Sequence, residues 1–188
     1  DLTGACENFM RALSLRPQFP MAEFNLATTY MLAGDLAAGW QGYERRAEIG
    51  PAPRVVLTGP RWQGESLAGK TIFLWCEQGF GDTLLFIRFV IELKRQGAAR
   101  VLLLCQTELA ELLRSIPEID QILVAGDAIP EYDYQSALLS VPLYLKTSVE
   151  TIPVEVPFLV PPAQRQQYWR DFLAEYAGKK VGLNWSGN

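Results

Sequence analysis

The chain has 188 residues, of which 49% are hydrophobic and 20% charged, a composition typical of globular proteins of one or two domains. Its net charge is −4 and it has no long Lys/Arg cluster, so bulk electrostatics argue against a nucleic-acid partner. It contains no histidine, which removes the commonest general base and metal ligand from this part of the molecule.

The apolar runs and the cysteines bear on the cellular compartment. The apolar runs are too short to cross a bilayer, and no secretory signal pattern opens the chain. The three cysteines, Cys6, Cys76 and Cys105, have neither disulfide-framework nor metal-site spacing, so buried thiols in a reducing compartment are expected. The sequence thus predicts a cytoplasmic protein without a membrane span. Its first residue is Asp rather than Met, which indicates a fragment of a longer protein.

Residues 1–50 are predicted to be helical, with small and aromatic residues at regular spacing. Pro17 and Pro51 stand about 34 residues apart, the period of the tetratricopeptide repeat, and the segment resembles the second helix of one such repeat followed by a whole repeat. An unrelated helical hairpin is the alternative. Arg46 stands where the pattern has alanine, as happens in a last repeat that is exposed or docked on something else. The agreeing positions are Ala5, Phe9, Ala12, Leu26, Ala27, Tyr30, Gly34, Gly39 and Tyr43.

So short a repeat segment needs support, because stable arrays contain about three or more repeats. The sequence therefore predicts either further repeats upstream or docking against the next domain. Residues 51–70 read as a linker punctuated by proline and glycine, which Trp62 and Leu67 are expected to pin to that domain.

Residues 71–96 predict the first strand–loop–helix unit of a doubly wound α/β domain. The run 71–76 is short, apolar and rich in β-branched and aromatic residues, as in a strand buried on both faces. The loop 77–82 contains two glycines and ends at Asp82, a good N-cap for a helix over 83–96. That helix is apolar except for one charged stripe of Arg88, Glu92 and Arg95. Ligands of such domains bind at the carboxyl ends of the strands, where this loop lies.

The rest of the domain, to residue 161, is predicted to contain three more strands, over 100–105, 121–124 and 134–139. Thr107 is expected to cap a helix that Pro117 stops, and Pro142 to break the pattern before a mostly irregular stretch. A helix then opens at Pro162 and ends at Gly178, and its aromatic face is expected to be core. Residues 180–185 are predicted to be the first strand of a truncated second α/β domain.

The order of these segments resembles the bacterial tetratricopeptide-containing glycosyltransferase-like proteins. The resemblance covers essentially the whole chain and is most specific at Arg61-Trp62, at 77–82 and at 185–188. It implies the N-terminal half of a GT-B fold, similar in plan to O-GlcNAc transferase and the heptosyltransferases: two Rossmann-like domains with the active site between them. In that family the nucleotide-sugar binds mainly to the second domain, and the reaction needs no metal.

The resemblance places Asp82 at the aspartate that is the candidate general base of heptosyltransferase-like enzymes. A base is needed, because an acceptor hydroxyl must lose its proton as it attacks the anomeric carbon. Two considerations oppose this role. A helix N-terminus stabilises the carboxylate anion, which weakens a base, and a helix cap alone would explain an aspartate here.

Two glycine loops are candidate binding sites. Gln78, Gly79 and Gly81 are assigned to the acceptor or sugar, because Glu77 and Asp82 would repel a phosphate and no P-loop sequence follows. Ser186, Gly187 and Asn188 are expected at a strand end, where the family's donor phosphates sit; an ordinary turn is the alternative. No cluster of oxygen or histidine ligands appears, so neither a metal nor another cofactor is expected.

Two functions follow. The first is a glycosyltransferase that moves a sugar from a nucleotide-sugar donor to a hydroxyl of a protein or glycan acceptor, with the helical repeats binding a protein partner. In that case we expect Asp82→Asn to slow turnover strongly, and this fragment alone to be inactive. The second is a protein-interaction module with a degenerate, non-catalytic α/β platform. A Rossmann-type oxidoreductase is disfavoured, because the Gly-x-Gly-x-x-Gly spacing is not met after Trp75.

Overall fold

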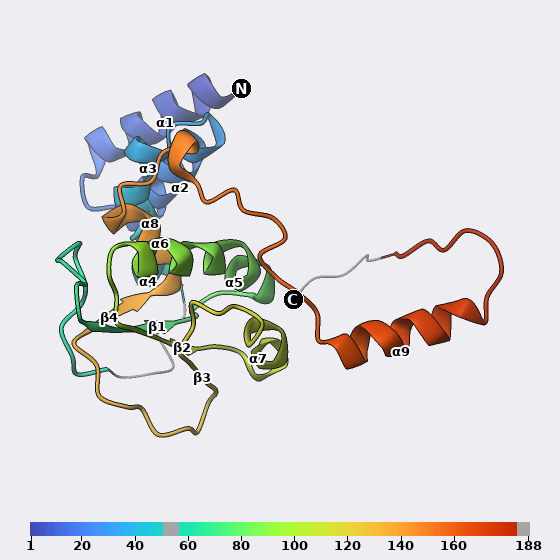
Figure 1. Ribbon diagram of the computed structural model, residues 1–188. Coiled ribbons are helices and arrows are strands. Elements are labelled where there is room, and N and C mark those ends of the chain that lie inside the picture. The colour runs from blue at the N-terminus through green and yellow to red at the C-terminus, as the bar shows by residue number, and fades with distance from the viewer. Residues whose placement is uncertain (51–56, 184–188) are drawn as a thin grey trace.

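The computed structural model describes residues 1–50 and 57–183, and Figure 1 shows their arrangement. The expected donor-phosphate residues Ser186, Gly187 and Asn188, and Pro51 and Pro53 of the linker, lie outside these ranges. The chain folds into a helical N-terminal segment, an α/β domain and a last helix that stands apart. No helix within the described residues has both the length and the apolarity needed to cross a membrane.

The helical segment contains α1 (Leu2–Leu15), α2 (Pro20–Leu32), α3 (Leu36–Tyr43) and α4 (Arg46–Ile49). The Asp35 carboxylate caps α3 by accepting a hydrogen bond from the Ala38 amide at 3.0 Å. Gly39 lets α2 and α3 approach closely, because a Cβ atom there would lie 2.9 Å from the Ala27 carbonyl oxygen. Small residues therefore permit close packing of these two helices.

The helical segment docks on the α/β domain, which was one of the two predicted ways of supporting it. The buried Trp40 indole of α3 donates a hydrogen bond to the Thr147 carbonyl oxygen at 2.7 Å. Its ring also packs edge-on against Phe86, with 6.3 Å between ring centroids. Residues far apart in the sequence therefore share one interface.

The α/β domain is built on a four-stranded parallel sheet in the order β3-β2-β1-β4. The strands are β1 (Thr71–Trp75), β2 (Arg100–Leu104), β3 (Gln121–Leu123) and β4 (Tyr134–Ala137). All four were predicted, and the structure confirms an α/β fold. The last strand ends two residues before its predicted end, because Leu138–Ser140 form a 3₁₀ turn.

The two faces of the sheet are covered differently. Alternate residues point to opposite faces, so Ile72 and Leu74 join one buried cluster and Phe73 the other. The first cluster lies under α5 (Phe80–Phe86), α6 (Val90–Arg95) and α7 (Thr107–Leu113). The second is smaller, and within the described ranges Leu57 and Tyr132 cover it and no helix does. The predicted pinning of the linker is confirmed, because Trp62 and Leu67 are both buried in the first cluster.

The predicted helix over 83–96 differs from the observed one in start and continuity. Gly79 is the N-cap of α5, so Asp82 is the third residue of the helix and not its cap. A 3₁₀ turn, Ile87–Phe89, separates α5 from α6. Residues three apart eclipse in such a turn, and Ile87 and Val90 are accordingly both in the core.

Two smaller predictions near helix starts were also wrong. Gln106, not Thr107, is the N-cap residue of α7. Pro142 does not break the chain but lies in the first turn of α8 (Val141–Tyr144), where its missing amide hydrogen is no loss. A short 3₁₀ turn, Val149–Thr151, follows before the mostly irregular chain that was predicted.

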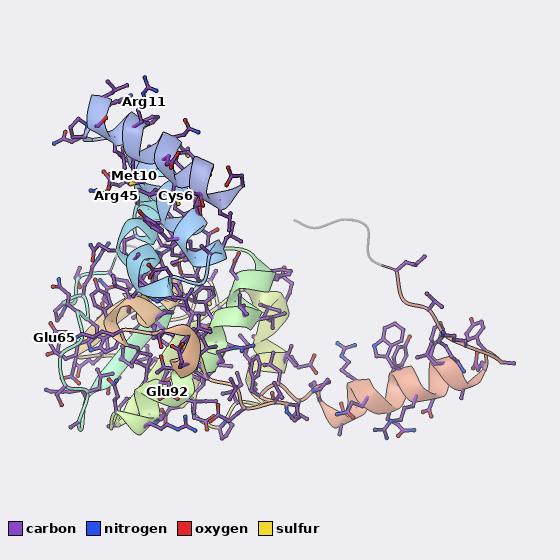
Figure 2. The ribbon with its side chains drawn as sticks, turned by 90° about the horizontal axis from the view of Figure 1, so that it is seen from above. Cys6, Met10, Arg11, Arg45, Glu65 and Glu92 are labelled. Atoms are coloured by element: carbon purple, nitrogen blue, oxygen red, sulfur yellow. The ribbon has the colours of Figure 1, made fainter. Side chains whose placement is uncertain are left out.

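The last helix, α9 (Ala163–Ala174), opens after Pro162 as predicted. Its aromatic side chains were expected to be core, but they are exposed, and α9 stands away from the rest of the chain in both views (Figures 1 and 2). The exposed residues are Tyr168, Trp169, Phe172, Leu173 and Tyr176. The next residues, 180–183, are exposed and form no strand, while 184 and 185 of the predicted strand lie outside the described ranges.

Candidate functional site

A pocket of about 410 Å³ opens at the carboxyl ends of β1, β2 and β4. The strand order changes direction between β1 and β4, and such points are where parallel sheets bind ligands. The helical segment supplies one wall, and the α/β domain supplies the others. The residues lining it are Glu44, Arg46, Ala47, Gly50, Arg61, Trp62, Trp75, Cys76, Glu77, Gln78, Gly79, Phe80, Leu104, Gln106, Gln135, Ser136, Ala137, Ser140 and Tyr144.

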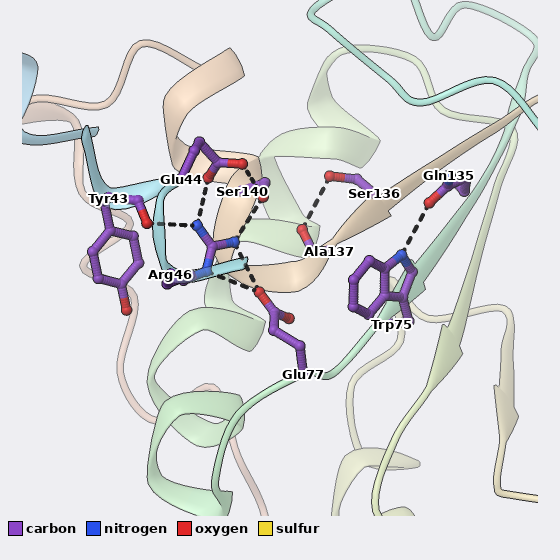
Figure 3. A network of polar contacts seen from close by, with 9 residues as sticks. All are labelled: Tyr43, Glu44, Arg46, Trp75, Glu77, Gln135, Ser136, Ala137 and Ser140. Atoms are coloured by element: carbon purple, nitrogen blue, oxygen red, sulfur yellow. Dashed lines mark hydrogen bonds and ion pairs between the residues drawn. The ribbon is translucent and has the colours of Figure 1, made fainter. Parts of the chain in front are cut away.

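Amide and aromatic side chains from the strand ends are held in place by hydrogen bonds. The Trp75 indole donates to the Gln135 amide oxygen at 3.0 Å (Figure 3). The Gln106 amide donates to the Gln78 carbonyl oxygen at 2.8 Å and meets the Thr83 hydroxyl at 3.1 Å. Apolar rings beside fixed amides suit a ligand that carries both hydroxyls and apolar faces.

Arg46 enters this pocket from α4 and is only 6% exposed. Its guanidinium donates to Glu77 Oε1 at 2.8 Å, to the Ser140 hydroxyl at 2.7 Å and to the Tyr43 carbonyl oxygen at 3.2 Å, as Figure 3 shows. It also pairs with Glu44, and lies 4.9 Å from the centre of the Tyr43 ring. Arg46, which occupies an alanine position of the predicted repeat pattern, therefore links the helical segment to the sheet.

Glu77 is the more buried of the two carboxylates that line the pocket, the other being Glu44. Its side chain is 13% exposed, and its Oε2 atom is buried without a hydrogen-bond partner among the described residues. Burial raises the pKa of Glu77 above its ordinary value, and the Arg46 charge opposes that rise. From the sequence, Glu77 was considered only as a negative charge that repels phosphate. In the structure, that charge is paired with Arg46.

The raised pKa predicts how stability depends on pH. A carboxyl whose pKa is raised by folding contributes stability below its unfolded pKa and loses it as the pH rises through the folded pKa. We therefore expect the free energy of unfolding of the wild type to fall relative to that of Glu77→Gln as the pH rises from the ordinary glutamate pKa through the raised pKa of Glu77. Urea titrations of both proteins across this range measure it, and a constant difference would contradict it.

The predicted site residues are only partly brought together. Gln78 and Gly79 line the pocket, whereas Gly81 and Asp82 are not among its lining residues. Asp82 is half-buried in the first turn of α5, at the same end of the sheet. Glu77, Arg46 and Gln106 were missed as site residues. The signal that could have pointed to Arg46 was its unusual occurrence at an alanine position.

Gly81 is not required by its local backbone. It lies in α5, and a Cβ atom added there would meet nothing within 4 Å. We expect Gly81→Ala to raise the free energy of unfolding by about 0.4–1 kcal/mol, since alanine restricts the unfolded chain. Gly39→Ala, which would contact the Ala27 carbonyl oxygen, should lower it in the same urea titration. A destabilised Gly81→Ala variant would contradict the observed helix start.

The cysteines behave as structural thiols. Burial raises the pKa of Cys76 to about 12 and that of Cys105 to about 11, so both are protonated thiols near neutral pH. All three cysteines, including Cys6, are free. The pocket therefore has no activated thiol nucleophile, although Cys76 lines it.

Comparison with known proteins found a relative of this chain. The chain is similar to Protein FlbA of Caulobacter vibrioides (strain ATCC 19089 / CIP 103742 / CB 15), with 29% identity over 200 aligned positions that cover 96% of this chain. These positions are 34% of FlbA, so the chain spans about a third of that relative's length. No family model matches the chain, and no solved structure matches it.

Proposed function

We propose that this chain is part of a glycosyltransferase-like protein in which the strand-end pocket holds the hydroxyl-bearing acceptor. A nucleotide-sugar would be bound largely by a second α/β domain. Ser186, Gly187 and Asn188 would bind the phosphates of that nucleotide-sugar. The observation that carries the proposal is the pocket itself, at the point where the strand order reverses. Its fixed amides and its aromatic rings suit a polyhydroxylated ligand.

The helical segment is proposed to be of tetratricopeptide type and to bind a protein partner. Its outer surface carries exposed apolar side chains, which mark interaction surfaces when they gather. They are Leu2, Met10, Leu15, Met21 and Leu32. We also propose a cytoplasmic location, which the three free cysteines support.

The experiment is nucleotide release by the full-length protein incubated with UDP-, GDP- or ADP-sugars and candidate acceptors. Turnover of one donor, strongly slowed by Asp82→Asn, would support transfer with Asp82 as the base. If Asp82→Asn does not change the turnover, Asp82 is not part of the mechanism, but the proposed transferase function still holds.

The second candidate is the non-catalytic module, and one observation favours it: the expected base Asp82 does not line the pocket. A full-length protein that binds a partner through its helical segment but releases no nucleotide from any donor would establish this alternative.

A further inference from the structure

We propose that Glu77, positioned by Arg46, is the carboxylate that accepts the hydrogen bond and then the proton of the acceptor hydroxyl. The inference rests on the proposed transferase function and names a group for it that the sequence did not. Glu77 would be the catalytic residue, and Arg46 a positioning residue that acts through it.

The two oxygens of Glu77 have different surroundings. Oε1 accepts hydrogen bonds from Arg46 Nη2 at 2.8 Å and from Arg46 Nε at 3.3 Å. Oε2 is buried and accepts none from the described residues. Buried carboxylate oxygens in native proteins nearly always have a partner. Oε2 is covered in this structure, so a side-chain rotation that turns it towards the pocket, which Glu77 lines, would let a ligand hydroxyl supply the missing hydrogen bond.

The charges around Glu77 suit a base. Burial raises the pKa of Glu77 and the Arg46 charge opposes that rise, and a raised pKa makes its carboxylate a better proton acceptor than an ordinary one. Arg46 is itself held by Glu44 and by the Ser140 hydroxyl, and that hydroxyl in turn donates to Glu44 at 2.8 Å. The guanidinium is therefore fully engaged and is not free to bind a ligand anion.

The transfer step balances with Glu77 as the base. The acceptor oxygen forms a bond to the anomeric carbon of the nucleotide-sugar, and the bond from that carbon to the phosphate oxygen breaks. The nucleotide leaves with the bonding electron pair. The hydroxyl proton passes to Glu77 Oε2 as its hydrogen bond shortens.

The decisive comparison uses the full-length protein and three carboxylate-to-amide variants. We expect Glu77→Gln to lower the transfer rate by about 100-fold or more, the usual effect of losing a general base. Glu92→Gln on α6, whose carboxylate pairs with Arg95, is the matched control and should retain the rate. Asp82→Asn should have a smaller effect than Glu77→Gln. Equal turnover in Glu77→Gln and wild type would overturn the inference while leaving the transferase function intact.

The positioning role of Arg46 is tested by a pH profile, which a purely structural role would not move. Loss of the positive charge in Arg46→Gln raises the pKa of Glu77, so the acid limb of the rate profile should shift to higher pH. Arg46→Lys retains the charge and should restore most of the wild-type profile. Variants that lose rate with an unshifted acid limb would show that Arg46 only supports the fold.

A second readout does not need turnover or the Arg46 variants. In protein labelled with ¹³C-glutamate, the carboxyl signal missing from Glu77→Gln identifies Glu77, and its titration should lie above that of ordinary glutamates. Methyl β-D-glucopyranoside, the hydroxyl probe, should shift this signal with saturation and leave that of Glu92 unchanged. An unmoved Glu77 signal would overturn the hydrogen-bonding role. If no donor is turned over, both the proposed transferase function and the proton transfer to Glu77 are contradicted. A shifted Glu77 signal would then support only the binding of a hydroxyl at Glu77.

Discussion

Replacing Arg46 with alanine is expected to lower the free energy of unfolding by about 3–5 kcal/mol, the usual cost of removing one partner from a buried ion pair. The substitution leaves Glu77 buried and uncompensated, and it removes the hydrogen bond to Ser140. It also weakens the contact between the helical segment and the sheet, because Arg46 lies on α4 and Glu77 follows the end of β1. Urea unfolding followed by tryptophan fluorescence measures the loss.

Arg45→Ala is the matched control for this prediction. Arg45 is the preceding residue, forms ion pairs with Glu23 and Glu48, and has a side chain that is 42% exposed. Exposed ion pairs contribute little, so this variant should unfold close to the wild type. The Arg46→Ala penalty should also shrink towards acidic pH, because Glu77 then becomes neutral. Equal effects of the two substitutions would contradict the burial of the Arg46 network.

Trp62→Ala is expected to lower the free energy of unfolding by about 3–5 kcal/mol, as large-to-small substitutions of buried tryptophan do. The Trp62 side chain is 1% exposed and packs edge-on against Tyr144, with 5.7 Å between ring centroids. Its indole donates a hydrogen bond to the Glu65 carbonyl oxygen at 2.8 Å. Its backbone amide donates a hydrogen bond to the Gln135 carbonyl oxygen, also at 2.8 Å. The substitution removes the linker's anchor and enlarges the pocket.

The control for Trp62 is another tryptophan in a different setting. Trp169 is 53% exposed on α9, so Trp169→Ala in this chain should change the free energy of unfolding by no more than about 0.5 kcal/mol. Thermal and urea unfolding of the two variants can be compared directly. A penalty for Trp169→Ala as large as that for Trp62→Ala would mean that α9 packs against a partner in solution.

Local patterns were sufficient to predict the sheet. Strands β1 and β2 come from short apolar runs, and glycine and proline residues mark the ends of β3 and β4. These signals involve only residues that are neighbours in the sequence, and all four strands were predicted from them. The prediction that Trp62 and Leu67 pin the linker was also confirmed. Element ends were less accurate, as at Asp82 and Pro142, because capping depends on backbone conformation that residue type only biases.

The candidate site required long-range contacts that no local pattern contains. Arg46 and Glu77 are 31 positions apart and Arg46 and Ser140 are 94 apart, and their pairing follows only from the docking of α4 on the strand ends. Residue types and spacing thus established an α/β chain with a helical N-terminal segment and a loop at the ligand-binding end of its sheet. Which carboxylates line the pocket was decided by packing between distant segments, since burial and ion pairing exist only once those segments meet.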